Sequence, residues 1–544
     1  MSSESAPSPV ETTASSSSSA SEGPVGNGHG TNAYDANGGS SSSGDGGRET
    51  AAGHSMAESA QASRTGICLN PDPTRVLFRE FAPHTEERAL KMVARVMQLS
   101  EADVQARLAN VLDEFQGRHR GLPGFFLKRF RDYQHLLFTD QPVSEQRQML
   151  IGSYFTQEYA YECAALFNPS MVWHPDQSGV PSGAKRFIIS LRAVGEGHIS
   201  SITFRAGLIH ADMTIEVEPT SRFATLPTPH HDRKFDRDLF EKKIYELHVG
   251  GNFVSRVLAG LEQDFTIHDL RREVNLSLST ERLKGNDYSQ IAETMLSLAE
   301  SNYEVVFDKK QNLSERILFP MTVSDVKGLE DARFVEFTDD DGATRFYGTY
   351  TAYNGRVFIP QLLQTEDFVT FRMSTLNGPA VQNKGLGLFP RKLNGRYAII
   401  SRQDNENIFL MTSDNVNFWH EKRILMRPTY SWEFVQLGNC GSPIETDEGW
   451  LVLSHGVGPM RKYAIGAFLL DLDDPSRVIG RTRHPILSPD GNEREGYVPN
   501  VVYSCGGQIH NGQLIIPYAM ADHASSFATM PVDDLIAEMK SNPI

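Results

Sequence analysis

The segment GLEDARFVEF, from Gly328 to Phe337, places two acidic residues and an arginine directly before an apolar run that is typical of a strand. An aspartate at the entrance of a strand can act as a general acid when burial raises its pKa. Asp331 is therefore a candidate acid, with Arg333 as its neighbour. A turn carboxylate that simply pairs with the nearby arginine is the structural alternative, and for this segment taken alone it is the more common one.

Three further polar side chains follow apolar runs. Arg402 comes after RYAIIS, where it could bind an anion through two N–H groups or form a salt bridge at a strand end. His455 lies in WLVLSHGVG, although a lone histidine is more often structural than catalytic, and Asp522 in MADH is a weak signal by itself. The sequence contains no phosphate-binding P-loop, dinucleotide fingerprint, nucleophile elbow or zinc-protease helix. These residues alone indicate a carbohydrate-type pocket at strand ends and name no reaction.

Composition narrows the class of protein. The 544 residues carry a net charge of -16 and no block rich in lysine and arginine, so nucleic acid and an anionic membrane are poor partners. No run approaches the roughly 18 apolar residues of a membrane span. The four cysteines lie far apart, and the N-terminus has no basic and apolar leader. We therefore expect reduced thiols, no metal site and a cytoplasmic location.

The elements that must position these residues change along the chain. Residues 1–63 are rich in Ser and Gly with little to bury, so we expect them to be disordered. Residues 64–152 have a helical pattern: Ser100 is a predicted N-cap, and Val104 and Leu108 begin one apolar face. Residues 153–544 consist of short apolar runs between turn residues, which predicts an all-β sandwich, barrel or propeller. Residues 235–301 again look helical and form a predicted insertion.

Taken in order, the segments from Ala164 to Ala528 resemble glycoside hydrolase family 130, the β-mannoside phosphorylases and related mannosidases. The segments that carry the resemblance include FNPSMV, LRAVGEGHISSITFRAG, GLEDARF, GTYTAY, LFPRKLNGRYAIISR, GSPIETDEGWLVLSHGV, GYVPNVVYSCG and PYAMADH. The resemblance implies a five-bladed β-propeller catalytic domain with an axial pocket. The predicted fold is thus an all-β core with an N-terminal helical extension and a helical insertion.

The resemblance also implies roles for individual residues. Asp331 matches the family's general acid, which delivers its proton through the 3-hydroxyl of the bound mannose and so needs a carboxyl that is protonated near neutrality. The predicted phosphate-binding residues are Lys384, Arg402, His455 and Tyr463, and the predicted substrate-binding residues are Asn168, Arg192, Arg333 and Asp522. The sequence departs from the family pattern at Gln436, where a lysine is expected, and this weakens the phosphate site without excluding it.

The predicted function is that of an inverting glycoside phosphorylase, which cleaves a β-mannoside with inorganic phosphate and releases α-mannose 1-phosphate. Its partners would be an oligosaccharide and phosphate, with no metal or organic cofactor, and a homo-oligomer stays among the options. An inverting β-mannosidase that uses water is the first alternative, with Glu433, Glu493 or Glu495 as its base. A sugar-binding propeller without catalysis is the second, and the presence of Asp331 and Arg402 disfavours it.

Overall fold

The computed structural model describes residues 60–230, 234–280 and 286–543. The disordered tail predicted for residues 1–63 lies outside the described residues except for its last four. Those four belong to the folded chain, because the Ala60 N–H donates to the Glu538 carboxylate at 2.9 Å and Ala62 is buried. Strand β1 (Ser63–Leu69) then pairs antiparallel with β29 (Ala524–Pro531), near the other end of the chain.

Residues 64–152, predicted to be helical, begin with strands and continue with helices. Strand β2 (Val76–Glu80) pairs with β3 (Thr156–Ala160), so both early strands have distant partners that a local pattern cannot reveal. The helices that follow are α1 (Glu86–Met97), α2 (Glu101–Phe115), α3 (Leu122–Tyr133) and α4 (Glu145–Tyr154). The Ser100 hydroxyl accepts a hydrogen bond from the Asp103 N–H at 3.1 Å, which confirms the predicted N-cap of α2.

The core of the protein is all-β, as predicted, and its strands form five antiparallel groups. The first group contains β4 (Ala165–Trp173), β5 (Lys185–Val194), β6 (Ser200–Ile209) and β7 (Ile215–Val217). The second contains β13 (Gly328–Thr338), β14 (Thr344–Tyr353), β15 (Phe358–Thr365) and β16 (Thr370–Thr375), and the third β17 (Gly387–Leu388), β18 (Tyr397–Ser401), β19 (Ile408–Ser413) and β20 (Glu421–Met426). The fourth contains β21 (Gln436–Asn439), β22 (Ile444–Thr446), β23 (Gly449–Val457), β24 (Tyr463–Leu470) and β25 (Val478–Arg481). The fifth contains β26 (Val502–Tyr503), β27 (Gln508–His510), β28 (Gln513–Met520), β29 and β1.

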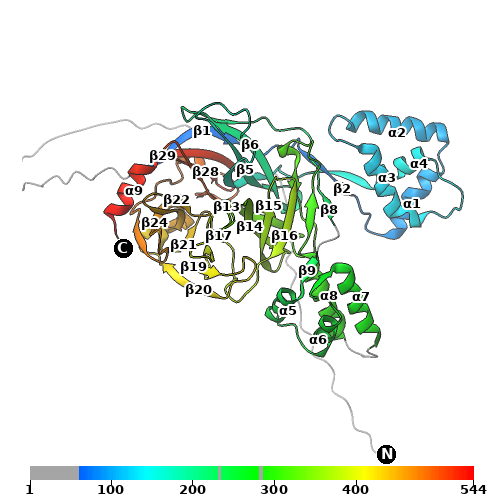
Figure 1. Cartoon of the computed structure of the whole chain (residues 1–544). Helices are drawn as coiled ribbons and strands as arrows, with labels where there is room; N and C mark the ends of the chain where they lie inside the picture. The colour runs from blue at the N-terminus through cyan, green and yellow to red at the C-terminus, as the bar shows by residue number, and fades with distance from the viewer. Residues whose placement is uncertain (1–59, 231–233, 281–285, 544) are drawn as a thin grey trace, which may run out of the picture. The chain divides into compact units, whose positions relative to one another are not determined.

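The first two groups are joined into one longer sheet. A parallel pair between Ser200 of β6 and Gly328 of β13 makes the connection. Three short strands extend this sheet, namely β8 (Thr228–His230), β11 (Glu304–Val306) and β12 (Ile317–Leu318). In Figure 1 the strands of the later groups follow one another in chain order, from green β14 through yellow β20 to red β29.

Strands are buried on both faces, and alternate side chains enter different cores. Along β23, Leu451 and Leu453 pack into one apolar cluster, whereas Trp450 and Val452 pack into another. Because successive side chains of a strand point to opposite faces, the fourth group must lie between two other sheets. Five apolar clusters link the groups, and each cluster contains side chains from two neighbouring groups. One pair from each cluster, in order from the first and second groups to the fifth and first, is Phe204 and Phe334, Phe337 and Ile399, Ile400 and Val452, Leu453 and Ile516, and Ile515 and Ile189. These clusters connect each group to the next and the fifth group back to the first.

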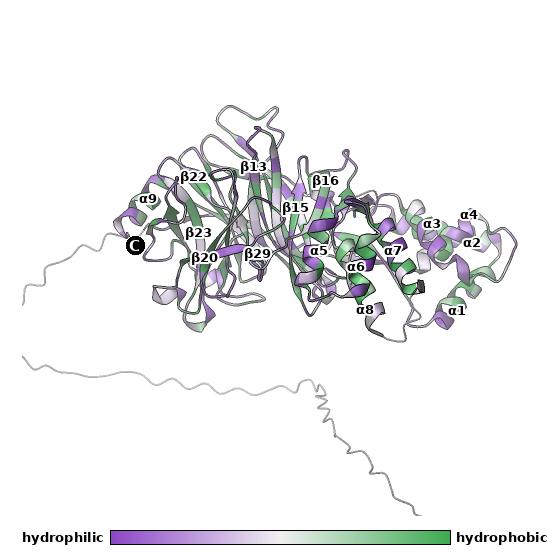
Figure 2. Ribbon diagram, turned by 60° about the horizontal axis from the view of Figure 1, so that its bottom comes forward, coloured by the Kyte–Doolittle hydropathy of each residue, from purple (hydrophilic) through white to green (hydrophobic). Residues whose placement is uncertain are grey.

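The predicted insertion has a core of its own. It contains β9 (Lys234–Asp236), α5 (Arg237–Glu246), α6 (Asn252–Ala259), β10 (Asp264–Thr266), α7 (Ile267–Thr280) and α8 (Asn286–Glu300). Figure 2 shows these helices with both green and purple segments, as expected of amphipathic helices, and Ile244, Val254 and Met295 are fully buried among them. The last helix, α9 (Val532–Ser541), packs Leu535 and Met539 onto the fourth and fifth groups. No helix within the described ranges combines the length and the apolar character that crossing a membrane requires.

Candidate active site

Two β-bulges bring the predicted acid and its first partner together. The register between β13 and β14 shifts between Glu330 and Arg333, and the register between β4 and β5 shifts just after Phe167. Asp331 and Asn168 lie in these bulges with φ of 54° and 50°, in the left-handed region that non-glycine residues rarely adopt. The Asn168 amide donates to Asp331 Oδ1 at 2.6 Å. Bulges and strained backbone of this kind concentrate at functional sites because they re-aim side chains.

Arg192 of β5 binds both acids of the GLEDARF segment. Its Nη1 donates to Asp331 Oδ1 at 3.0 Å, and its Nη2 donates to Glu330 Oε1 at 2.7 Å. The Lys384 ammonium lies 3.6 Å from the other Glu330 oxygen. Lys384 therefore contacts the group around Asp331, although it was predicted as a phosphate ligand. Sequence reasoning left Glu330 out of the site, and its position next to Asp331 in the motif was the only signal for it.

The electrostatic surroundings favour the ionised form of Asp331. Burial opposes ionisation, but the positive charges of Arg192, Lys384 and Arg333 outweigh it and hold the pKa of Asp331 well below its ordinary value. This lowered pKa contradicts the expectation that the Asp331 carboxyl is protonated near neutrality. The reason is that a local motif does not reveal a cation from another strand, such as Arg192.

Asp522 behaves in the opposite way. It lies in the turn between β28 and β29 with φ of 51°. Burial is the main cause that raises the pKa of Asp522 to about 6, and the negative charge of Asp331 is the second. The site thus contains two carboxyl groups whose surroundings separate their pKa values, which is the arrangement that distinguishes an acid from a charged partner in many enzymes.

Arg333 is fixed by three hydrogen bonds, and the bond to Asp331 goes to its backbone carbonyl. It donates to the Tyr503 hydroxyl at 2.6 Å, to the Cys440 carbonyl at 3.0 Å and to the Asp331 carbonyl at 3.0 Å. Only 3% of Arg333 is exposed. Tyr503 was not predicted as a site residue, although it lies in the segment GYVPNVVYSCG that contributed to the resemblance.

A second group is built around Arg402 and His455, which are both buried. Arg402 Nη1 donates to His455 Nε2 at 3.2 Å, and this requires an unprotonated Nε2. Burial and the charges of Arg402 and Arg333 hold the pKa of His455 well below its ordinary value, so the ring is neutral. The ring stacks on Tyr463 at 6.0 Å and tilts against Tyr503 at 4.8 Å. The structure therefore brings together three of the predicted phosphate ligands.

Glycine allows the two groups to lie close to each other. A Cβ atom at Gly385 would be 3.6 Å from Arg402 Cβ and 3.9 Å from Arg333 Nη2, so this backbone lies against both arginines. At Gly438 the fit is closer still, because a Cβ atom would be 2.5 Å from His455 Cε1 and 3.0 Å from Arg402 Cδ. His455 and Arg402 can therefore occupy these positions only because residue 438 has no side chain.

We expect Gly438→Ala to displace His455 and Arg402 and to destabilise the protein by about 1–3 kcal/mol, as overpacking does in buried sites. Thermal unfolding measures this loss. Gly491→Ala is the matched control, since a Cβ atom there meets nothing within 4 Å. Equal melting temperatures for the two variants would show that the ring and the guanidinium can shift without cost.

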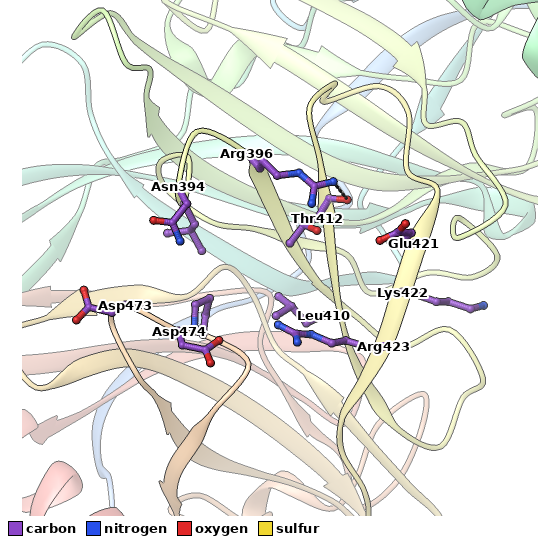
Figure 3. Close-up of a pocket in the computed structure, with 11 residues that line it drawn as sticks. Asn394, Arg396, Leu410, Thr412, Glu421, Lys422, Arg423, Asp473 and Asp474 are labelled. Atoms are coloured by element: carbon purple, nitrogen blue, oxygen red, sulfur yellow. Dashed lines mark hydrogen bonds between the residues drawn. The ribbon is translucent and has the colours of Figure 1, made fainter.

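A recess of about 560 Å³ lies elsewhere. It is lined by Asn394, Arg396, Leu410, Thr412, Glu421, Lys422, Arg423, Asp473 and Asp474, among others (Figure 3). None of the predicted site residues lines it. Its charges are mixed, and Arg396 is already paired with Asp414 at 3.1 Å, so it lacks the buried carboxyl and guanidinium groups found around Asp331 and Arg402.

The sequence is similar to that of known carbohydrate-active proteins. The sequence model of a family described as beta-1,4-mannooligosaccharide phosphorylase, glycoside hydrolase family 130, matches residues 267–541. A 1,2-beta-oligomannan phosphorylase from a Thermoanaerobacter species is 33% identical over 230 residues, which are 41% of this chain and 75% of the relative. A beta-1,4-mannooligosaccharide phosphorylase from Ruminococcus albus is 35% identical over 211 residues, 36% of this chain and 62% of the relative.

Among solved structures, the beta-1,2-mannobiose phosphorylase of Listeria innocua in complex with beta-1,2-mannobiose is similar to this chain at a TM-score of 0.42 and 21% identity, covering 70% of this chain and 93% of the other. The family model spans half of the chain, and the Thermoanaerobacter relative is matched over three quarters of its length at 33% identity. The chain therefore belongs to glycoside hydrolase family 130.

Proposed function

We propose that the protein is an inverting phosphorylase that cleaves a β-mannoside with inorganic phosphate and yields α-mannose 1-phosphate. The observation that carries the proposal is the buried pair of Arg402 and His455, which bind each other and leave the Asp331 carboxylate to Asn168 and Arg192. A guanidinium and a neutral imidazole offer hydrogen bonds to a phosphate dianion. Related proteins matched by the sequence are phosphorylases of β-mannosides, which supports the same reaction.

The contacts of two glutamates disfavour hydrolysis. Glu433 is fully buried and bound to Arg481, and it also caps a short helical turn by accepting from the Tyr430 N–H. Glu493 is bound to Arg64 at 2.6 Å and accepts from the Tyr518 hydroxyl at 2.6 Å. Because both carboxylates are committed to structural ion pairs, neither is available to activate a water. Of the three bases considered for a mannosidase, this leaves Glu495, which lies exposed at the surface.

In the proposed reaction a phosphate oxygen forms a bond to the anomeric carbon as the bond to the glycosidic oxygen breaks. The leaving sugar takes a proton that originates from Asp331 and passes through a mannose hydroxyl. The proton of hydrogen phosphate then restores Asp331, so atoms and charge balance. Lys384, Arg402, His455 and Tyr463 are the proposed phosphate side of the site, and Asn168, Arg192, Arg333 and Asp522 are the proposed sugar side.

The lowered pKa of Asp331 is compatible with this role. A phosphate dianion bound beside Arg402 would offset the positive charge that lowers the pKa of Asp331. Asp522, whose pKa is about 6, is a second carboxyl that can hold a proton close by. Phosphate binding would therefore be accompanied by proton uptake, and the acid would become protonated only when its reaction partner is present.

We infer that the five strand groups are the blades of a five-bladed propeller. The five apolar clusters that link successive groups, and the fifth to the first, support a closed arrangement. Strand β1 from the beginning of the chain completes the last group beside β29, which ties the two ends of such a ring together. Closure also explains why Asn168, Asp331 and Asp522, far apart in sequence, meet in one site.

Phosphorus NMR on the purified protein tests the function. A panel of β-mannosides is incubated with inorganic phosphate, and a phosphate-free reaction serves as the control. A signal of α-mannose 1-phosphate supports the proposal. Free mannose released equally without phosphate would identify a hydrolase, and no product from any substrate would favour a sugar-binding protein.

The raised pKa of Asp522 predicts a pH-dependent stability. The carboxyl ionises at a pKa of about 3.8 in the unfolded chain and about 6 in the folded one, so the folded state binds more protons between these values. Stability therefore falls as pH rises from about 4 to 6, and above pH 6 the full cost remains, on the order of 2–3 kcal/mol. We expect Asp522→Asn to melt at a higher temperature than the native protein at pH 8 but not at pH 4. A difference that is the same at both pH values would contradict this.

A further inference from the structure

We propose that Gln436 is the residue that sets the affinity of the site for phosphate, because its amide occupies the guanidinium of Arg402 and has to yield when the anion binds. The inference rests on the proposed function and deepens it. It concerns a side chain that is partly buried at the start of β21, two residues before the Gly438 that lies against His455.

The contact between Gln436 and Arg402 is direct. With the amide oxygen toward the guanidinium, Gln436 Oε1 accepts from Arg402 Nε at 3.0 Å and also from Nη1. This orientation is required because both facing atoms of arginine are donors. Arg402 Nη1 is shared with His455 Nε2 at 3.2 Å. Two of the three nitrogens of Arg402, Nε and Nη1, are therefore engaged by Gln436 and His455.

An incoming phosphate competes with this amide. Arginine binds phosphate best through two parallel N–H groups, and a dianion attracts the guanidinium charge more strongly than a neutral amide oxygen does. A dianion can therefore displace the Gln436 oxygen from Arg402. The amide can then turn its NH₂ group toward the anion, since it carries a donor at its other end. A neutral glutamine thus holds Arg402 in place without cancelling its charge.

The charge at position 436 should therefore determine how strongly phosphate binds. A glutamate of the same shape would form an ion pair with Arg402 and repel the phosphate, whereas a lysine would add a second cation. We expect Gln436→Glu to raise the KM for phosphate about 100-fold, as like charges in contact do, with little change in the KM for the mannoside. We expect Gln436→Lys to lower the KM for phosphate.

Gln263→Glu is the matched control, because the Gln263 oxygen also accepts from a guanidinium, Arg237 Nη2 at 3.1 Å, on the exposed helical insertion. It should leave both KM values unchanged. The same proteins are melted with inorganic phosphate alone, and the rise in melting temperature should be lost in Gln436→Glu and kept in the control. A phosphate KM within twofold of the native value in Gln436→Glu would overturn the inference.

The experiment separates this inference from the proposed function. If the native protein cleaves mannosides without phosphate, the phosphorylase proposal fails, and the melting series still decides the role of Gln436. A stabilisation by phosphate that Gln436→Glu abolishes supports the inference in that case too. An absence of any phosphate stabilisation, or an equal stabilisation of both proteins, overturns it.

Discussion

Replacing Asp331 with asparagine is expected to reduce phosphorolysis of an unactivated β-mannoside by roughly 10²–10⁴-fold, the range over which a general acid acts. Asparagine keeps the shape of the side chain and can still contact Asn168 and Arg192, but it cannot deliver a proton. The loss should appear in kcat, because the leaving sugar needs the proton only in the transition state. Initial rates with a β-1,2- or β-1,4-linked mannobiose measure it.

The leaving group distinguishes an acid from a residue that only positions the sugar. A mannoside with a nitrophenol leaving group needs little protonation, so Asp331→Asn should lose far less activity on it than on the disaccharide. Asp341→Asn, which changes an exposed turn carboxylate, is the matched control and should retain full activity. An equal loss on both substrates would make Asp331 a positioning residue, and unchanged turnover would remove it from the reaction.

Local features of the fold could be predicted from the sequence because they depend on near neighbours. The cap at Ser100 and the buried Val104 of α2 follow from a spacing of three or four residues. Short apolar runs between turn residues likewise predicted the all-β core. Strand β1 could not be predicted, because its exposed pattern becomes a strand only through pairing with β29, more than 450 residues later.

The candidate site shows the same division. Residue types at strand ends made Asp331, Arg402 and His455 candidates, and the structure places them in two neighbouring groups. Their protonation states could not be predicted, because these depend on charges that arrive from other strands. Arg192 is 139 positions from Asp331 in sequence and yet accounts for the largest charge effect on its pKa. Side-chain chemistry is local information, whereas the electrostatic potential is a property of the assembled fold.

Replacing Arg402 with methionine should reduce phosphate-dependent turnover by about 10²–10³-fold, comparable to the loss of one preorganised group that stabilises charge in a transition state. Methionine fills a similar volume and leaves the anion without its buried cation. The KM for phosphate should rise, while binding of the sugar by the residues around Asp331 should change little. The variant also removes one of the charges that lower the pKa of His455, so the imidazole should titrate at higher pH than in the native protein.

Arg396→Met provides the control for Arg402→Met. Arg396 lines the recess of Figure 3 and pairs with Asp414 at the surface, so its loss should affect neither turnover nor the titration of His455. The two readouts separate three outcomes for Arg402→Met. A loss of turnover with a higher pKa of His455 supports an anion site at this pair, and a higher pKa with unchanged turnover places the phosphate elsewhere. Unchanged values of both would mean that the contact between Arg402 and His455 has no bearing on the reaction, and a loss in Arg396→Met would move the search for the site to that recess.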